Sequence, residues 1–312
     1  MPNPTEGPLV RELREIGEGK RTFPKTTARR HHYVPAFLLA AFAEPRGDRH
    51  GFMAQLDTGS GQPRKTTPND ACFEKDLYAQ QGDSGRDNTL EAFFSIIENH
   101  SAPAIQRLLA DPLKLTPEDR ETLSYYLAFQ HNRSPVVLAQ LGNMAESMSL
   151  AMFAVHFEDA VAFRRVYREA IEAEATDEEI ESFRHYMKER LQSGAVAMSD
   201  PKAQAFELML STADAVAETI HQMQWTLVAA GGDEFVISDR ALAMHDPTPR
   251  FPWSGHALRS SPNAETTLPL TPEHALLLDD GPPRMGRTTC NATAVRKINL
   301  RTYGWAERFI YA

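Results

Sequence analysis

Two adjacent histidines, His31 and His32, are the residues of this 312-residue chain whose types most directly suggest chemistry. Imidazole binds metal ions and transfers protons near neutral pH. Adjacent side chains of an extended segment point to opposite sides, so only one of the two can face a given site. The Tyr33-Val34-Pro35 that follows favours a fixed orientation for His32. In the alternative interpretation, both are loop histidines that hydrogen-bond backbone carbonyls.

Two glutamates, Glu91 and Glu98, lie seven residues apart in a run whose apolar spacing predicts a helix from about residue 88. Seven residues are two helical turns, so the two carboxylates share one face, about 10 Å apart. At that spacing they could flank a substrate, or each could join ligands from elsewhere. Surface glutamates at the rim between two helices would show the same spacing.

Gln130 and Arg133 occur in the sequence FQHNRSP and share one face of a predicted helix that ends before Pro135. A helix C-terminus favours a cation, and an arginine there could bind a carboxylate or phosphate through two parallel hydrogen bonds. Alternatively, Arg133 caps the helix or pairs with Glu91 or Glu98.

Asp239 follows the apolar run Phe235-Val236-Ile237-Ser238, which predicts a buried strand with a carboxylate at its end. A turn-forming aspartate would occupy the same position. Together with the residues above, Asp239 completes a candidate catalytic set of His31, His32, Glu91, Glu98, Gln130, Arg133 and Asp239. Within this set, His32, Glu98 and Asp239 are the candidate ligands of a divalent metal ion, because histidine and carboxylates are usual ligands of such ions.

The elements that must position these residues follow from the order of apolar patterns and helix caps. A strand and hairpin turn are predicted at 51–65, and strands at 266–270 and 275–278. A further hairpin is predicted at 224–238 around Gly231-Gly232-Asp233. Helices are predicted at 36–43, from 88 with a kink or break at Pro103, and at 117–133, 136–172, 177–193, 201–222 and 292–308.

This order predicts an α+β fold, predominantly helical, with long helices packed on a small, mainly antiparallel sheet. Residues 1–28 are expected to form a flexible basic arm, and residues 29–312 a single domain. A helical insert at about 136–222 is the main alternative boundary. The arm precedes His31, and residues 11–30 hold seven basic and three acidic side chains. It could neutralise an anionic ligand, or it could be a solvated terminus.

Composition excludes several classes of protein. Hydrophobic residues make up 42%, which is enough for a sizeable core, while the longest apolar runs are too short to span a bilayer. Cys72 and Cys290 are too few for a disulfide scaffold, and no secretory leader is recognisable, so we expect a cytoplasmic protein. The net charge of −9 argues against a surface coated with phosphate-binding lysines. No phosphate loop, GxGxxG, GxSxG, HExxH or CxxC motif occurs, so no nucleotide cofactor is indicated.

The blocks HHYVPAFLLAAFA, FEKDLY, LEAFFSIIE, FQHNRSP, QWTLV and FVISD, and the closing run NLRTYGWAERFIYA, resemble an uncharacterised bacterial family, domain-of-unknown-function family 4238. The resemblance covers most of residues 29–312, and its specific part is HHYVP before a short apolar helix. Two positions depart from the family's pattern: Ser134 stands in place of threonine, and Arg240-Ala241-Leu242 in place of asparagine, proline and a small apolar residue. The resemblance implies that the seven candidate residues form one constellation, and it implies no activity.

Three functions remain open on these residues. The first is a metal-dependent hydrolase of phosphoester bonds, such as a nuclease, in which Arg133 stabilises developing phosphate charge. The second is a non-catalytic binding or sensor module for an anionic ligand or a protein partner. The third is a buried polar network that only fixes the fold. Nucleic acid or another anionic ligand is thus the expected partner and a membrane is not, while the sequence leaves the oligomeric state open.

Overall fold

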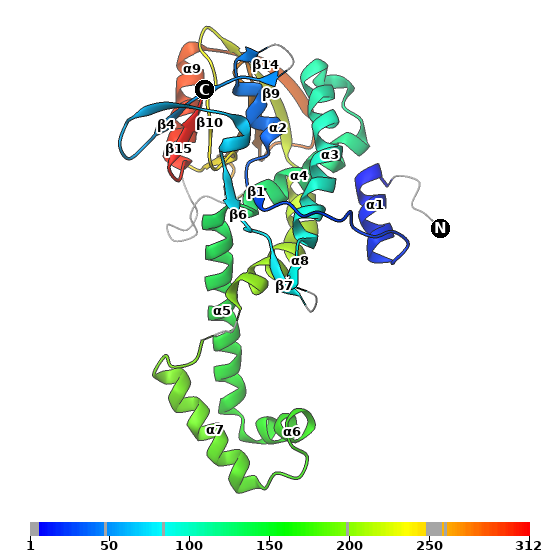
Figure 1. Ribbon diagram of the computed structural model, residues 1–312, viewed down its shortest axis with the longest axis vertical. Coiled ribbons are helices and arrows are strands. Elements are labelled where there is room, and N and C mark those ends of the chain that lie inside the picture. Colours follow the sequence, from blue (N-terminus) through cyan, green and yellow to red (C-terminus); the bar gives the residue numbers. More distant parts are fainter. Residues whose placement is uncertain (1–5, 47–48, 83–84, 198–199, 248–257, 259–260) are drawn as a thin grey trace. The chain divides into compact units, whose positions relative to one another are not determined.

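The chain divides into two compact units, one formed by residues 1–135 with 212–312 and one by residues 136–211. The computed structural model describes residues 6–46, 49–82, 85–197, 200–247, 258 and 261–312 (Figure 1). The second unit falls inside the helical insert that the sequence offered as an alternative boundary. No helix among the described residues has an apolar stretch long enough to cross a bilayer.

The N-terminal segment, for which the sequence predicted a flexible basic arm, contains one helix. Pro8–Gly17 forms helix α1, which begins with proline and buries Leu9 completely. Several of its basic side chains are paired: Arg14 contacts Glu6 at 2.9 Å and Arg21 contacts Glu12 at 3.0 Å. The arm is therefore largely neutralised by its own carboxylates.

The helices of the first unit begin where the sequence places caps. Helix α4 (Pro117–Asn132) starts after Thr116, whose hydroxyl accepts a hydrogen bond from the Asp119 N–H at 3.1 Å. Helix α3 (Thr89–Ala110) runs through Pro103 as one element, so of the kink or break predicted there, the break does not occur. The other helical elements of this unit are α2 (Ala36–Leu39), α9 (Ala292–Trp305), the C-terminal part of α8 (Pro201–His221) and the 3-10 turns η1 (Ala40–Phe42), η2 (Pro68–Asp70) and η3 (Pro112–Lys114).

Two sheets supply most of the described strands, both in the first unit. The larger has the order β11-β12-β13-β9-β14, and the smaller has the order β10-β15-β4-β5. Their bounds are β11 Ala243–His245, β12 Glu265–Thr271, β13 His274–Asp279, β9 Gln224–Gly231, β14 Met285–Asn291, β10 Ile237–Ser238, β15 Phe309–Tyr311, β4 Met53–Asp57 and β5 Pro63–Thr66. The mixed α+β class is confirmed, whereas the expectation of one small sheet understated the strands. Pairing is mainly antiparallel, except that β14 runs parallel to β9.

Strand pairing follows the sequence only where the partners are close along the chain. The hairpin β4–β5 forms as predicted, and the strands predicted at 266–270 and 275–278 pair with each other as β12 and β13. The hairpin predicted at 224–238 is wrong, because β9 pairs with β13 and β14, and β10 pairs with β15. Both faces of β9 carry buried apolar residues, so two long-range neighbours satisfy this strand better than the short run of β10 could.

Three short antiparallel ladders complete the first unit. They join β1 (Arg30–His32) to β6 (Phe73–Lys75), β2 (Pro45–Arg46) to β3 (Arg49–His50), and β7 (Gln80–Gly82) to β8 (Gly85–Asp87). The first ladder matters most for the candidate site, because it holds the two histidines in extended backbone. Figure 1 shows β1 and β6 beside each other.

Apolar packing between the larger sheet and α9 forms one part of the core. Val228, Phe235, Ala275, Val295 and Ile298 make a buried cluster there. A second anchor is the fully buried Trp225, whose indole N–H donates to the Ile220 carbonyl at 2.9 Å while the Arg120 guanidinium lies 4.4 Å from its ring.

The second unit is helical, with α5 (Pro135–Glu158), α6 (Ala160–Ala170), α7 (Asp177–Gln192) and the first part of α8. The single helix predicted over 136–172 is wrong, because Asp159 interrupts it. The Asp159 carboxylate accepts hydrogen bonds at 3.0 Å from the N–H groups of Val161 and Ala162, which caps α6. A small core of Phe157, Phe163, Ala175 and Ile180 holds α5, α6 and α7 together.

We predict that Gly231→Ala weakens the first unit by about 1–3 kcal/mol, the usual cost of overpacking. A Cβ at this position would lie 2.7 Å from the Cys290 carbonyl oxygen of the paired strand β14. Gly17→Ala is the matched control, because a Cβ there meets nothing within 4 Å and alanine favours a helix. Urea unfolding of both variants measures the effect, and equal midpoints would contradict it.

Candidate functional site

His31 is fully buried in β1, and hydrogen bonds occupy both of its ring nitrogens. Its Nδ1 accepts the Tyr78 N–H at 2.9 Å, so the ring proton belongs on Nε2, which donates to the Ala28 carbonyl at 3.1 Å. The ring also stacks on that of Tyr78, with centroids 5.6 Å apart. In this conformation His31 therefore connects three backbone segments and offers no free nitrogen to a substrate.

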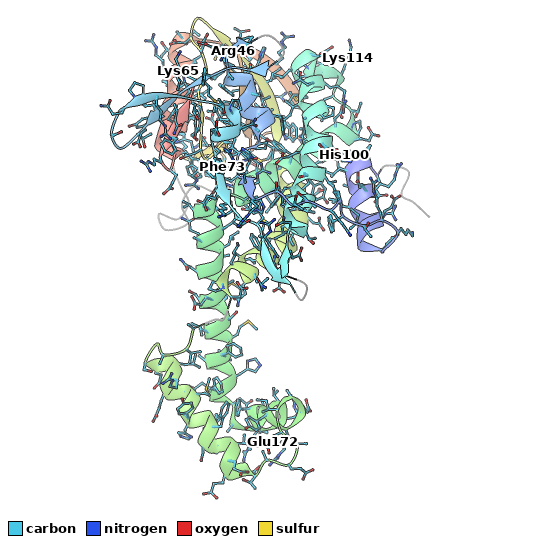
Figure 2. All side chains as sticks on the ribbon, viewed as in Figure 1. Arg46, Lys65, Phe73, His100, Lys114 and Glu172 are labelled. Atoms are coloured by element: carbon cyan, nitrogen blue, oxygen red, sulfur yellow. The ribbon has the colours of Figure 1, made fainter. Side chains whose placement is uncertain are left out.

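His32 faces the other side of β1, as expected for adjacent residues in extended backbone. Its half-buried ring packs against Phe73, with centroids 5.8 Å apart, and its Nε2 lies 3.3 Å from the Asn69 carbonyl. Figure 2 labels Phe73 among the side chains of this unit. Burial lowers the pKa of His32 below its ordinary value of 6.5. The imidazole is thus neutral at pH 7 and able to accept a proton.

Arg133, the C-cap residue of α4, is buried with only 2% of its surface exposed. Its Nε donates to the Tyr33 carbonyl at 3.0 Å, and its Nη1 donates to Glu98 Oε1 at 2.8 Å. Gln130 donates to the same carbonyl at 2.8 Å. Of the roles left open by the sequence, the structure shows pairing of Arg133 with Glu98.

Tyr78 is a residue of this region that the sequence reasoning did not single out. Its hydroxyl donates to the Arg133 carbonyl at 2.9 Å, while its N–H binds His31. The only sequence signal was its position in the FEKDLY block, two residues after Asp76. In the structure Asp76 adopts a positive φ of 57°. Tyr78 thereby couples the histidine segment to the end of α4.

Glu91 and Glu98 lie on the face of α3 that the seven-residue spacing predicted, yet their surroundings differ. Burial, followed by repulsion from Glu98, raises the pKa of Glu91 to about 7, and the charge of Arg133 opposes this rise. Glu98 instead forms the ion pair with Arg133. We call His32, Glu91, Glu98 and Arg133 the Arg133 cluster, because their charges act on one another.

Three polar atoms on one face of α4 are buried without a hydrogen-bond partner among the described residues. They are Tyr126 Oη, Gln130 Oε1 and Arg133 Nη2, spaced by four and three residues. A buried donor or acceptor without a partner costs about 1–3 kcal/mol. Arg133 Nη2 is thus a charged donor in the cluster whose bonding capacity is unused.

Asp239 belongs to a different arrangement. Its carboxylate accepts three backbone hydrogen bonds, from the N–H groups of Glu307 at 2.9 Å and of Arg308 and Phe309 at 2.8 Å. Burial raises the pKa of Asp239, and these three donors counteract the rise. The carboxylate therefore fixes the chain at the start of β15 and makes no hydrogen bond to the Arg133 cluster in the described structure.

The metal-ligand expectation gains no support from these positions. Within the described part of the chain, no three His, Cys, Asp or Glu side chains gather closely enough to hold a metal ion. His32, Glu98 and Asp239 do not form a ligand set in this conformation, so binding of a divalent ion stays a prediction.

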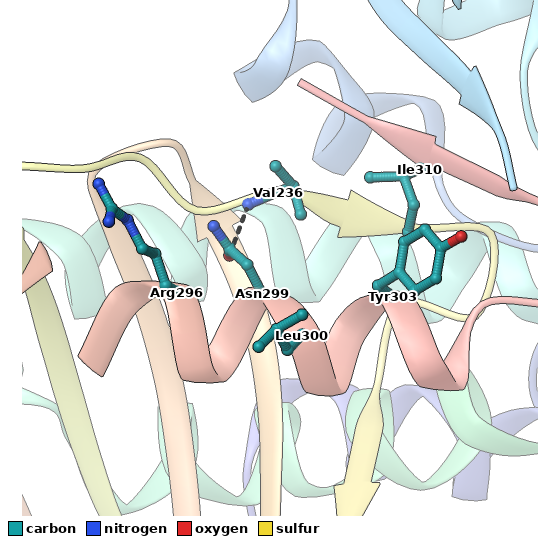
Figure 3. Close-up of a pocket in the computed structure, with 6 residues that line it drawn as sticks. All are labelled: Val236, Arg296, Asn299, Leu300, Tyr303 and Ile310. Carbon is teal, nitrogen blue, oxygen red and sulfur yellow. Dashed lines mark hydrogen bonds between the residues drawn. The ribbon is translucent and has the colours of Figure 1, made fainter. Parts of the chain in front are cut away.

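The first unit has a narrow cavity at the end of α4 and an open groove on α9. A narrow cavity next to Gln130 is lined by His131, Ser134, Asp239, Arg240 and Trp305, and the Arg240 guanidinium lies 4.4 Å from the Trp305 ring. An open groove on α9 is lined by Val236, Arg296, Asn299, Leu300, Tyr303 and Ile310 (Figure 3). The groove is almost entirely apolar, and Arg296 is paired with Asp233 at 2.7 Å, so it offers no acid–base chemistry.

Residues 30–312 match the family described as "Protein of unknown function (DUF4238)". The match covers nearly the whole chain, including every candidate residue. No curated protein and no solved structure matches the chain.

We predict that Glu91→Gln gains stability relative to the wild type as the pH rises. The pKa of Glu91 is about 7 when folded, against an ordinary value of 4.5, so the folded state holds the proton longer. Wild-type stability is therefore lost between about pH 4.5 and 7, and glutamine, which does not titrate, avoids this loss. Urea unfolding at pH 5 and pH 8 measures the difference between the two proteins. Glu234→Gln, at an exposed position, should show no such change, and a pH-independent difference for Glu91→Gln would refute the assignment.

We predict that His31→Ala destabilises the first unit by about 2–4 kcal/mol, because it removes the acceptor of the Tyr78 N–H and one of the two donors to the Ala28 carbonyl, and opens a cavity. His221→Ala removes a side chain that makes no hydrogen bond within the described residues and serves as the control. Thermal and urea unfolding compare the two, and a cost below that of the control would contradict a structural role for His31.

Proposed function

Because this chain belongs to DUF4238, a family of unknown function, we propose its function from the geometry of the Arg133 cluster. The proposal is a hydrolase of phosphoester bonds in which Glu91 transfers the proton. The observation that carries it is the partly buried Glu91 carboxyl group, whose pKa is raised to about 7 and on which the charges of the Glu98–Arg133 ion pair act.

The pKa of Glu91 suits general acid–base catalysis. Proton transfer is most effective when the pKa of the catalytic group lies near the working pH, and an ordinary glutamate is almost fully ionised at pH 7. Within the cluster Glu98 is neutralised by Arg133, while Glu91 is the carboxyl group that holds or releases a proton at that pH. Two carboxyl groups in such different environments are typical of an acid–base site.

The reaction assigns a role to each group. Ionised Glu91 takes a proton from a water molecule, the water oxygen attacks phosphorus, and the ester P–O bond breaks. The leaving oxygen then receives a proton, for which protonated Glu91 is the source. Arg133 Nη2, which has no partner among the described residues, is the donor for a phosphoryl oxygen.

The roles assigned above do not include a metal ion, and the assay determines whether the reaction needs one. The cluster supplies proton transfer and positive charge from its own side chains, and no residue is assigned as a metal ligand. The same assay with and without divalent ions therefore separates the two forms of the reaction.

A binding module for an anionic ligand is the second candidate, and Arg240 favours it. Its half-buried guanidinium lies over Trp305 in the narrow cavity beside Gln130, and no carboxylate of the described residues lies within ion-pair distance. A partly buried cation of this kind can recognise a carboxylate or phosphate group.

The wild type should hydrolyse bis(p-nitrophenyl) phosphate or p-nitrophenyl phosphate, assayed with EDTA and with Mg²⁺ or Mn²⁺. We expect Glu91→Gln to lower kcat/KM by about 100-fold or more, in the range for loss of a general acid–base group. Below about pH 7 the wild-type kcat/KM should fall as the Glu91 carboxylate takes up its proton. Glu234→Gln should leave the rate unchanged.

Absence of wild-type turnover in every metal condition, or equal rates for Glu91→Gln and the wild type, would overturn the hydrolase. Phosphate that raises the melting temperature of the wild type but not of Arg240→Ala, with no turnover, would support the binding module instead.

A further inference from the structure

A stripe of exposed methionines runs along α5 inside the unit of residues 136–211. Met144, Met148 and Met152 are 46%, 55% and 62% exposed, and their four-residue spacing places them on one face of the helix. Val155, 70% exposed, extends the stripe toward the end of the helix. Such a contiguous apolar surface is uncommon on a monomer and usually marks an interface.

The sequence of α5 is that of a covered helix. Between Pro135 and Phe157 the only acidic or basic side chain, apart from His156, is Glu146. A helix that is apolar on every side is normally buried, yet most of this helix is not. Its buried residues are only Val137, Leu138, Gly142 and Phe157.

A groove beside the stripe is built into the same unit. It lies between α5 and the first part of α8 and is lined by Met148, Ser149, Met152, Gln204 and Leu208. Gly142 permits the close approach of the two helices, because a Cβ there would lie 2.9 Å from the Pro201 carbonyl oxygen. The groove offers a place for side chains of a partner next to the exposed methionines.

We propose that the occupant is a second copy of this chain, packed with its α5 antiparallel to the first across a two-fold axis at Met148. The stripe is symmetric about that residue, so Met144 of each copy faces Met152 of the other. A two-fold interface requires a self-complementary surface of this kind. Methionine side chains are flexible enough to fill the two grooves.

Charge favours a second copy over a charged partner. Glu146 is two residues from Met148 and so lies roughly 160° away around the helix, which keeps the two Glu146 carboxylates away from a contact centred on Met148. Glu207 lies at the groove wall, and α5 carries no lysine or arginine. A strongly charged partner would bury unpaired charges against this stripe, whereas the neutral stripe of another copy does not.

The contact area that α5 alone can offer is smaller than the area a stable dimer usually buries. A 24-residue helix is about 36 Å long and offers roughly 360 Å² if its contact face is about 10 Å wide. A standard interface buries about 800 Å² per partner. The dimer therefore needs α8 of both copies as well, where Leu210 is 41% exposed.

The full chain should sediment as a dimer in analytical ultracentrifugation, with dissociation on dilution. Met148→Glu places two carboxylates together at the axis and should raise the dissociation constant at least about 100-fold. Met148→Leu should retain the dimer. Leu113→Glu changes an exposed apolar residue of the other unit, 70% exposed against 55% for Met148, and is the control. Circular dichroism establishes that each variant is folded.

Cross-linking tests the axis itself. In a Cys290→Ser background, Met148→Cys should form an intermolecular disulfide on mild oxidation, and Val161→Cys, exposed on α6, should not. A wild type that is monomeric at all concentrations, or a dimer unaffected by Met148→Glu, would overturn the proposal. So would a monomer that binds phosphatidylglycerol vesicles through Met148, which would make the stripe a lipid contact.

Discussion

The first unit depends on the burial of one guanidinium group. Removing a charge from water is costly unless the protein supplies an opposite charge and hydrogen bonds, and Arg133 is almost fully enclosed. Glu98 supplies the charge and the Tyr33 carbonyl accepts a hydrogen bond, while the Phe94 ring lies 5.4 Å from the guanidinium carbon. These partners come from the histidine segment and from α3, so satisfying Arg133 fixes α4 against both.

The same ion pair accounts for the difference between the two glutamates of α3. Arg133 can neutralise only one of them closely, and its Nη1 is directed at Glu98. Glu91 is left in a partly buried position beside a second carboxylate, which makes its ionisation costly. The identity of the proton-holding group thus follows from where the arginine points, and the sequence spacing treats both glutamates alike.

Most helices could be predicted because their caps and apolar spacing are local in the sequence. Strand pairing between distant segments could not be predicted. Thr116 and Thr176 each cap a helix at the position predicted, because the cap depends on residues only a few positions away. The β10–β15 and β9–β14 pairs join segments about 60 residues or more apart, and no turn in the sequence specifies them. For the site, the Glu98–Arg133 pair was among the stated alternatives. Asp239 was assigned to that site, yet three backbone N–H groups near the C-terminus satisfy its carboxylate.

Each unit has one feature that lowers its stability and that the fold does not require. In the first unit a carboxyl group is held where its ionisation is unfavourable, and in the second an apolar helix face is left in water. Folded domains are stable by only about 5–15 kcal/mol, so features that lower stability by a few kcal/mol are a large fraction of the total. Such conflicts between local chemistry and the fold concentrate at functional sites, because there a ligand or partner resolves them. The Glu91 carboxyl group and the methionine stripe of α5 are conflicts of this kind, and the two proposals assign a substrate to the first and a second copy of the chain to the other.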